Sequence, residues 1–546
     1  MRTPVPSAPN LPAILLSFVC LTGAAAAALA DPPPLAGALS RMAAAAPREA
    51  RLFDNLQALY EAFGYQPIWG DPRLRRQLEE GIASSALDGL NPADYALPER
   101  DAHAGTADRE AALNQQDVLL SRSLLMLLSH LYFGKLDPTL NHADWNLQDL
   151  RKLTDDPELI PAAIRAGDIA TLLEQARPQQ VLYPRLKAAL AEYRAIAAGG
   201  GWPLLPSKRM LATGMSDPLI PQLRRRLALT GDYAGSDAPA QHEVYDQALT
   251  AAVQRFQRRH LLADDGVIGP ATWQALNVPA AARIDQIRAN LERMRWALKG
   301  LQGEFLLVDI AGFAMHLVRD DEVLWTSPVQ VGNPYRQTPV LSSTVRYLEW
   351  NPTWTIPPTI LDHDVIPAIQ RNPDYLASKH MVVLTHGGQI VDPDTIDWRR
   401  YPQRQFPYLI RQLPGPDNAL GTVKFIFPNQ HAVYLHDTPS KALFKETRRA
   451  FSSGCIRVGK PYELARILLR GQRELSDADI QAILAAGKTR RDHLDQGLPI
   501  VILYWTTKWL PDGSLVFAPD LYDRDARIVA GLDNQQPAAV AQTVVR

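Results

Sequence analysis

Cys455 is the residue whose type and position most directly suggest covalent chemistry. It lies in the stretch FSSGCIRV, and the 546-residue chain has two cysteines. The other, Cys20, lies in an apolar N-terminal segment that has the features of a signal peptide. A single thiol in an exported protein is either buried and inert or reactive, because it has no partner for an internal disulfide.

The neighbours of Cys455 favour a reactive thiol. A thiol becomes a nucleophile when a base or a positive charge stabilises the thiolate, from a free pKa of ~8.5. Arg457 supplies positive charge or ties down the loop, and Gly454 lets a substrate carbonyl approach the backbone closely. The amides of Gly454 and Cys455 are candidates for holding a developing oxyanion. We therefore expect Cys455 to attack a carbonyl group.

A nucleophilic thiol also needs a base, and the chain contains 12 histidines. His436 follows a predicted strand in HAVYLHDTPSK, and its spacing from Cys455 places both residues in one predicted domain. Residue types alone leave His431, His386 and His380 open as alternatives.

A mostly β region from about residue 304 to 530 must position these side chains. The stretch FLLVDIAGFAMHLVRDDEVLWTSPVQVG predicts three strands, with Asp320-Asp321 at a hairpin turn. The segments VKFIF, AVYLH and PIVILYWT predict further strands. Pro461 suits the first turn of a helix, so the helix is expected to begin after Cys455. Cys455 is therefore expected where a strand passes into a loop, and not inside a helix.

Residues 357–418 interrupt this β pattern with irregular, proline-rich sequence. A long insertion in a β domain often forms a lid over a site, although it can also be a mere decoration. We predict a capping insertion here.

The rest of the chain is predicted to be helical. Residues 31–203 show apolar positions at three- and four-residue spacing and predict a helical scaffold that ends near Gly199-Gly200-Gly201. Residues 204–280 predict a small helical bundle, and residues 281–303 a connector helix. Residues 531–546 form a predicted C-terminal tail. The expected fold class is therefore a multidomain α+β protein with a helical scaffold, a small helical module and a mostly β domain.

The N-terminus predicts export. Arg2 provides a short positive region, an apolar run follows, and Ala28-Leu29-Ala30 fits a signal-peptidase site, which makes residues 1–30 a signal peptide cleaved after Ala30. An uncleaved membrane anchor is the alternative, because the apolar run is close to ~18 residues. Phe18 and Val19 argue against a lipoprotein signal at Cys20.

Composition and missing motifs exclude several classes of function. The net charge of −1 leaves no basic excess for binding nucleic acid or an anionic membrane. The sequence has no glycine-rich phosphate loop, no S-x-x-K motif of serine transpeptidases and no H-E-x-x-H zinc motif. We therefore expect no nucleotide, no metal and no cofactor.

The segment from His436 to Arg457 resembles the YkuD-type catalytic domain of the L,D-transpeptidases. VYLHDTPSKALF followed by SSGCIRV matches their histidine and the S-x-G-C-x-R pattern that follows it. The flanks VGNPYRQTPVLSSTVRYLEWNPTWTIPPTI and RQLPGPDNALGTVKFIF resemble the large Gram-negative branch of this family, which carries a helical scaffold, a wall-binding module and a capping insertion.

The small helical bundle resembles the peptidoglycan-binding module of bacterial wall enzymes. The matching positions are Ala252-Val253, Phe256-Gln257, Asp265-Gly266, Ile268-Gly269, Thr272 and Ala275-Leu276. Most of them are core or turn positions in any such bundle, so the resemblance implies glycan binding only by analogy.

The family resemblance implies roles for the residues around the thiol. Cys455 matches the nucleophile and His436 the base that deprotonates it. Ser452, Gly454 and Arg457 match the remaining motif, whereas Ser453 stands where many members have histidine. Asp437 stands where many have glycine or serine.

Other residues are assigned with alternatives. The family orients its histidine through a main-chain carbonyl, so Asp437 could contribute either its carbonyl or its carboxylate. Tyr434 is a possible oxyanion donor. Trp354 and Asn351 resemble residues that face the cap, with buried aromatic packing as the alternative for Trp354.

The implied function is a periplasmic L,D-transpeptidase that forms 3–3 peptidoglycan crosslinks through a cysteine thioester. The expected substrates are tetrapeptide stems, which a D,D-carboxypeptidase would supply, and carbapenems should acylate Cys455. Motifs do not distinguish an amine acceptor from water, which leaves an L,D-carboxypeptidase or endopeptidase as alternatives. Two further transferase alternatives use a lipoprotein or a free D-amino acid as the acceptor. A non-catalytic wall-binding scaffold is an alternative of a different class.

Overall fold

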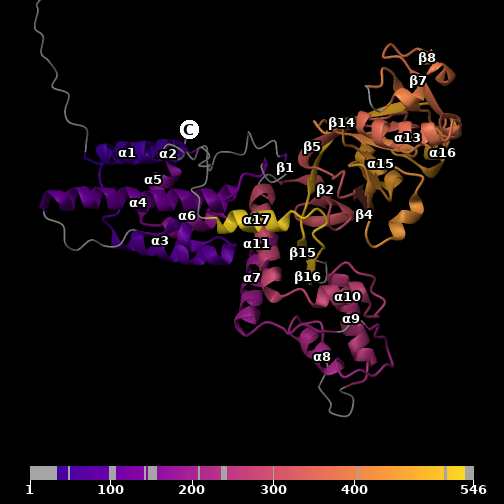
Figure 1. Ribbon diagram of the computed structural model, residues 1–546. Helices are drawn as coiled ribbons and strands as arrows, with labels where there is room; N and C mark the ends of the chain where they lie inside the picture. Colours follow the sequence, from indigo (N-terminus) through magenta and orange to yellow (C-terminus); the bar gives the residue numbers. More distant parts are fainter. Residues whose placement is uncertain are drawn as a thin grey trace, which may run out of the picture.

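The computed structural model contains a helical region, a small helical module and a mostly β domain, which confirms the predicted multidomain α+β class (Figure 1). It describes residues 34–46, 50–97, 106–139, 143–144, 156–206, 209–234, 243–298, 301–401, 405–509 and 513–534. The predicted signal peptide at 1–30 and most of the predicted tail lie outside these residues. Within the described part of the chain, no helix combines the length and the apolar character needed to cross a bilayer.

The helical region is built around one long helix, α4 (Thr106–Phe133), which runs between α1 and α2 on one side and α3 on the other (Figure 1). Leucines that recur along α4 are fully buried in a core shared with the surrounding helices. The other helices here are α1 (Pro34–Ala45), α2 (Ala50–Ala62), α3 (Pro72–Ser85), η2 (Ala86–Asp88), η3 (Pro92–Tyr95), α5 (Leu159–Ala166), α6 (Ile169–Ala176) and α7 (Leu182–Ala198).

The small module consists of α8 (Ile220–Ala228), α9 (Gln247–Arg259) and α10 (Pro270–Leu276) around its own core. The predicted turn at Asp265-Gly266 is present, and Gly266 has a φ of +72°. Gln257 holds this turn, because its side chain accepts from Gly266 N at 2.9 Å and donates to Val267 O at 2.9 Å. The motif residues of the module therefore act here as core and turn residues.

Helix α11 (Ala280–Ala297) links the module to the β domain and is buried on most of its surface. Its side chains Glu292 and Arg295 are both 0 % exposed and form an ion pair at 2.5 Å. Glu292 Oε1 accepts from Leu136 N at 2.7 Å, and Arg295 Nη1 donates to Asp88 O at 2.7 Å. The pair thus ties α11 to two separate segments of the helical region, η2 and the loop after α4.

The C-terminal helix α17 (Asp525–Asp533) packs against α11 and returns the chain to the helical region (Figure 1). Its buried residues Ile528 and Leu532 belong to the core of that region. The predicted boundary between residues 530 and 531 therefore falls inside a helix.

The β domain is a sheet that closes on itself. Its strands follow the order β1-β5-β10-β11-β13-β4-β3-β2-β14, with β12 on β4, and β14 also pairs with β5. The helical region contributes β1 (Ala143–Asp144) to its edge. The remaining strands are β2 (Glu304–Asp309), β3 (Ala314–Arg319), β4 (Glu322–Gly332), β5 (Val340–Trp350), β10 (Val423–Ile426), β11 (Leu435–His436), β12 (Ala450–Ser452), β13 (Ile456–Val458) and β14 (Arg490–Leu503).

The predicted hairpin at Asp320-Asp321 joins β3 to β4 and pairs Arg319 with Glu322. Both aspartates have positive φ, 50° and 63°. Two central residues with positive φ are the requirement of a type I′ turn, whose twist matches that of the flanking strands.

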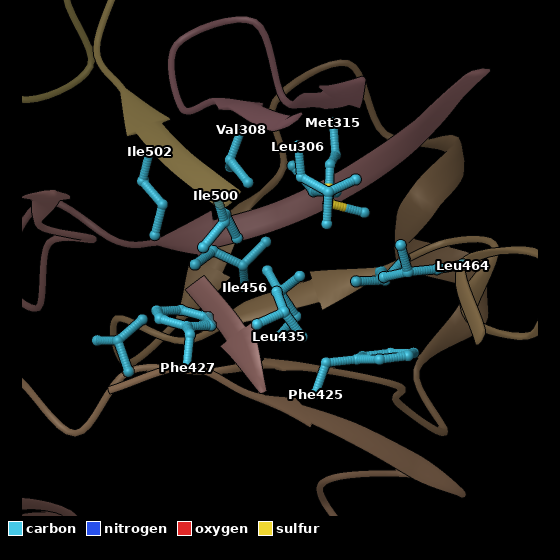
Figure 2. Close-up of a cluster of buried hydrophobic side chains, with 14 of the residues drawn as sticks. Leu306, Val308, Met315, Phe425, Phe427, Leu435, Ile456, Leu464, Ile500 and Ile502 are labelled. Atoms are coloured by element: carbon cyan, nitrogen blue, oxygen red, sulfur yellow. The ribbon is translucent and has the colours of Figure 1, made fainter. Parts of the chain in front are cut away.

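The interior of the closed sheet is filled by apolar side chains from strands on opposite sides (Figure 2). Leu435 of β11 and Ile456 of β13 lie in this cluster beside Leu306 and Ile500. Helices α15 (Pro461–Leu469) and α16 (Asp477–Ala485) add residues such as Leu464 to it. A further hairpin, β15 (Thr507–Trp509) and β16 (Leu515–Phe517), extends toward the small module.

The predicted insertion forms a subdomain with its own four-stranded sheet and apolar core, which we call the cap. Its sheet has the order β6-β9-β7-β8. A π-helix, η8, lies within its first helical segment. The cap elements are β6 (Trp354–Thr355), α12 (Pro358–Ile360), η8 (Leu361–Val365), α13 (Ile366–Arg371), α14 (Tyr375–Ser378), β7 (Met381–Leu384), β8 (Ile390–Val391), η9 (Pro393–Thr395), η10 (Trp398–Arg400) and β9 (Leu409–Gln412).

Glu292→Gln should destabilise the protein strongly, because it leaves the buried Arg295 without its counterion. Removing one partner of a buried ion pair costs about 3–5 kcal/mol of unfolding free energy. Chemical denaturation followed by circular dichroism measures this loss. Glu158→Gln is the control: Glu158 and its partner Arg165 are 59 % and 48 % exposed, so about 0–1 kcal/mol is expected. Equal losses in the two variants would contradict this role of Glu292.

Candidate active site

His436 is the last residue of β11, and Cys455 directly precedes β13, the parallel neighbour of β11. In β11 and β13, Leu435 pairs with Ile456 and His436 with Arg457. Ile456 N donates to Tyr434 O at 3.1 Å. Leu435 and Ile456 both point into the core (Figure 2). Because side chains alternate along a strand, Tyr434, His436, Cys455 and Arg457 share the opposite face.

A main-chain carbonyl orients the His436 imidazole. Its Nδ1 lies 2.5 Å from Asp437 O, and the ring is 4 % exposed. A carbonyl can only accept, so in the neutral imidazole Nδ1 carries the proton and Nε2 is the basic nitrogen. His436 is therefore in the tautomer that a general base requires.

The Asp437 carboxylate has other partners. It accepts from Thr422 N at 3.0 Å and from Thr422 Oγ1 at 2.8 Å, and it forms an ion pair with Lys441. Gly421 leaves room for it: a Cβ there would lie 2.5 Å from Asp437 Cγ, and Gly421 has a φ of +63°. Of the two ways in which Asp437 could act on His436, the structure uses the carbonyl.

The segment before Cys455 is fixed by hydrogen bonds to its backbone. Ser452 Oγ donates to Cys455 O at 2.5 Å and accepts from Gly454 N at 3.2 Å. Thr338 Oγ1 donates to Gly454 O at 2.8 Å, and Gly454 has a φ of +109° that favours glycine. The Gly454 amide thus has a partner inside the protein, which makes the Cys455 amide the better oxyanion donor.

Tyr434 lies between the thiol, the imidazole and the cap. Its ring centroid is 5.8 Å from that of His436. Burial raises the pKa of Tyr434 well above its ordinary value, and the nearby Cys455 adds a smaller rise. A hydrogen bond with Trp354 lowers the pKa of Tyr434 in part. The phenol therefore stays protonated as a donor, and Trp354 of β6 contacts it from the cap.

Arg457 and Asn351 are held by the protein itself. Arg457 Nη1 donates to Gln330 Oε1 at 3.1 Å. Asn351 is buried, has a φ of +46°, and donates its side-chain amide to Ile483 O at 2.8 Å. These contacts account for Asn351 as a residue that fixes a turn. Its predicted contact with substrate stays a prediction.

The protonation of the two central groups is governed by burial. Burial raises the pKa of the Cys455 thiol, whereas hydrogen bonds from Tyr434 and the charge of Arg457 lower it. Burial, followed by Arg457, lowers the pKa of His436 to about 3. Arg457 acts in the predicted direction on the thiol, but burial outweighs it. The resting pair is therefore a neutral thiol and a neutral imidazole.

The structure separates His436 from the alternative bases. His380 and His386 are exposed residues of the cap, and His431 is exposed in the loop before β11. His436 alone of these four lies on the strand that pairs with the segment of the thiol.

Several residues that support the site were not singled out from the sequence. Gln330 holds Arg457, and Thr338 holds Gly454. Thr422 and Lys441 hold Asp437, and Arg336 donates to Ser453 Oγ at 3.1 Å. The turn signal Gly332-Asn333-Pro334, at the end of the third predicted strand, was the available hint for Arg336 and Thr338.

Residues 303–480 match the family model described as "L,D-transpeptidase catalytic domain". This stretch is therefore similar to the catalytic domain of the L,D-transpeptidases. This confirms the resemblance seen in the segment from His436 to Arg457. Residues 216–276 match a "Putative peptidoglycan binding domain" and residues 54–190 a "Scaffold domain".

A curated protein of Haemophilus influenzae named "Putative L,D-transpeptidase" is 36 % identical over 243 residues. This alignment covers 44 % of the chain and 48 % of that protein, so the chain spans about half the length of its relative. Solved structures of L,D-transpeptidases are also among those similar to this chain. One from Xylanimonas cellulosilytica is 14 % identical with a TM-score of 0.18, covering 55 % of this chain and all of that one. One from Mycobacterium smegmatis is 15 % identical with a TM-score of 0.18, covering 37 % and 59 %.

The rate at which iodoacetamide alkylates Cys455 should rise with pH through and beyond ~8.5, the pKa of a free thiol. The reason is that burial disfavours the thiolate in the folded protein. A Cys20→Ser background makes Cys455 the one thiol, and the denatured chain supplies the reference curve. A plateau at acid pH, typical of ion-paired thiolates with pKa of about 3.5–7.5, would contradict the neutral pair.

Proposed function

We propose that this protein is an L,D-transpeptidase that crosslinks peptidoglycan stems through a Cys455 thioester. The observation that carries the proposal is the placement of the thiol and a correctly oriented imidazole on one face of the paired strands β11 and β13. A nucleophile, a base and a third group that orients the base form the arrangement required for covalent acyl transfer.

In the first half-reaction, Cys455 attacks the carbonyl of the third stem residue, a diamino acid, while His436 Nε2 takes the thiol proton. The C–N bond to the terminal D-alanine then breaks, and His436 returns the proton to the leaving amine. The Cys455 amide and the Tyr434 hydroxyl are the proposed oxyanion donors, each worth about 10²–10³ in rate. The starting pair is neutral, so the imidazolium exists only during the reaction.

In the second half-reaction, the side-chain amine of a neighbouring stem attacks the thioester. Its nitrogen bonds to the acyl carbon, the C–S bond breaks, and the thiol regains its proton through His436. The product is a 3–3 crosslink. Arg457, Ser452, Ser453, Trp354 and Asn351 are the remaining proposed contacts to substrate or to the loop that holds it.

The other domains suit an extended wall polymer. The match of residues 216–276 to a peptidoglycan-binding family supports binding of the same polymer that the catalytic domain modifies. We therefore place the protein in the periplasm, where its substrate lies, with a D,D-carboxypeptidase as the supplier of tetrapeptide stems. We further propose carbapenems as acylating agents of Cys455.

Purified disaccharide-tetrapeptide incubated with the wild-type protein should yield a dimer lighter than two tetrapeptides by one D-alanine. Cys455→Ser should abolish it, because the nucleophile is lost. Mass spectrometry of the products makes the measurement, and unchanged circular dichroism of the variant is the control. Free tripeptide without dimer would show water as the acceptor, and unchanged substrate would contradict autonomous catalysis.

A further inference from the structure

The loop between β4 and β5 contacts each of the three residues that precede Cys455. Asn333 N donates to Ser452 O at 3.0 Å, and Thr338 Oγ1 donates to Gly454 O at 2.8 Å. Between them, Arg336 Nη1 donates to Ser453 Oγ at 3.1 Å. The guanidinium of Arg336 therefore lies directly beside the nucleophile segment.

The same guanidinium also contacts the cap. Arg336 Nη1 forms an ion pair with the carboxylate of Asp364, which belongs to the π-helix η8. Short π-helical segments occur frequently at functional sites. A single cation thus bridges the segment of Cys455 and the cap.

Both side chains of this ion pair are exposed to solvent. The Arg336 side chain is 27 % exposed and that of its partner Asp364 is 50 % exposed. In the neighbouring pair, Lys441 is 51 % exposed but its partner Asp437 is 4 % exposed. Arg457 is engaged by Gln330 within the sheet. A carboxylate arriving from solvent can therefore displace the exposed Asp364 from Arg336 more readily than it can displace the buried Asp437 from Lys441.

The chemistry of Arg336 suits such an arrival. A guanidinium offers five donors in a planar fork that matches a carboxylate. Among the described residues, its side-chain contacts to Asp364 and Ser453 both involve Nη1. Its Nη2 and Nε donors can therefore bind a second carboxylate while Asp364 is being displaced.

We propose that Arg336 recognises a carboxylate of the donor stem peptide, and that this carboxylate replaces Asp364. This inference rests on the proposed function, whose tetrapeptide stems carry several carboxylates. Substrate binding would then release η8 from the nucleophile segment, because the ion that holds it has exchanged partners. Arg336 is thereby a specificity residue, and Asp364 is its counterion in the free enzyme.

Equilibrium binding tests this without any turnover. Calorimetry measures the affinity of Cys455→Ala protein for the disaccharide-tetrapeptide and for versions amidated at one carboxylate at a time. One amidation should weaken binding about tenfold to a hundredfold, the range for a hydrogen bond between charged groups. Adding Arg336→Gln should remove this discrimination. Asp364→Asn should tighten binding of the acid form, because the competing anion is gone.

Hydrogen exchange supplies a second readout. Both Asp364→Asn and binding of the tetrapeptide should speed exchange of amides in η8. Arg400 and Asp397 form an exposed ion pair within the cap, 73 % and 53 % exposed, and supply the matched controls Arg400→Gln and Asp397→Asn. Neither control should change the ratio of the affinity for the tetrapeptide to the affinity for its amidated versions.

The inference is overturned if every amidation weakens binding equally with and without Arg336, or if Arg400→Gln has the same effect. It is also overturned if the tetrapeptide does not bind. Failure of the proposed function would be a different result: discrimination at Arg336 with no crosslinked product from the wild-type protein.

Discussion

The parallel pairing of β11 with β13 is the constraint on which the active site depends. It places His436 opposite Arg457 and buries Leu435 against Ile456. A shift of one residue would turn the imidazole into the apolar core and expose a leucine, which the core opposes. The closed sheet, with β14 bonded to both β2 and β5, leaves these short strands little freedom to slip.

Main-chain geometry and burial then define the chemistry. The Asp437 carbonyl selects the tautomer of His436, and the carboxylate of the same residue is anchored to Thr422 and Lys441. The neutral pair avoids holding a separated charge in the free protein. In the proposed reaction, charge develops only during attack, and Tyr434 and the amide of Cys455 are the proposed donors to the oxyanion.

The sequence predicted Cys455, His436 and the turn at Asp320-Asp321 because each has a local signal: a motif, a spacing or a turn preference. No local pattern encodes the features that join segments distant in the chain. These features are the pairing of β14 with β5, the pairing of β1 from the helical region with β5, and the ion pair from Arg336 to the cap. Helix α11 was predicted as a connector, yet it is buried, because its charged residues pair with one another and with distant segments of the helical region.

The state of the imidazole tests the central claim most directly. Protein with ¹⁵N-labelled histidine, in which His436→Gln assigns the signal, reports the protonation of both ring nitrogens across a pH titration. The account predicts Nδ1 protonated and Nε2 unprotonated at neutral pH, unchanged until the pH approaches about 3. An imidazolium near neutral pH that disappears in Cys455→Ser would contradict it, because the resting enzyme would then hold a thiolate–imidazolium pair.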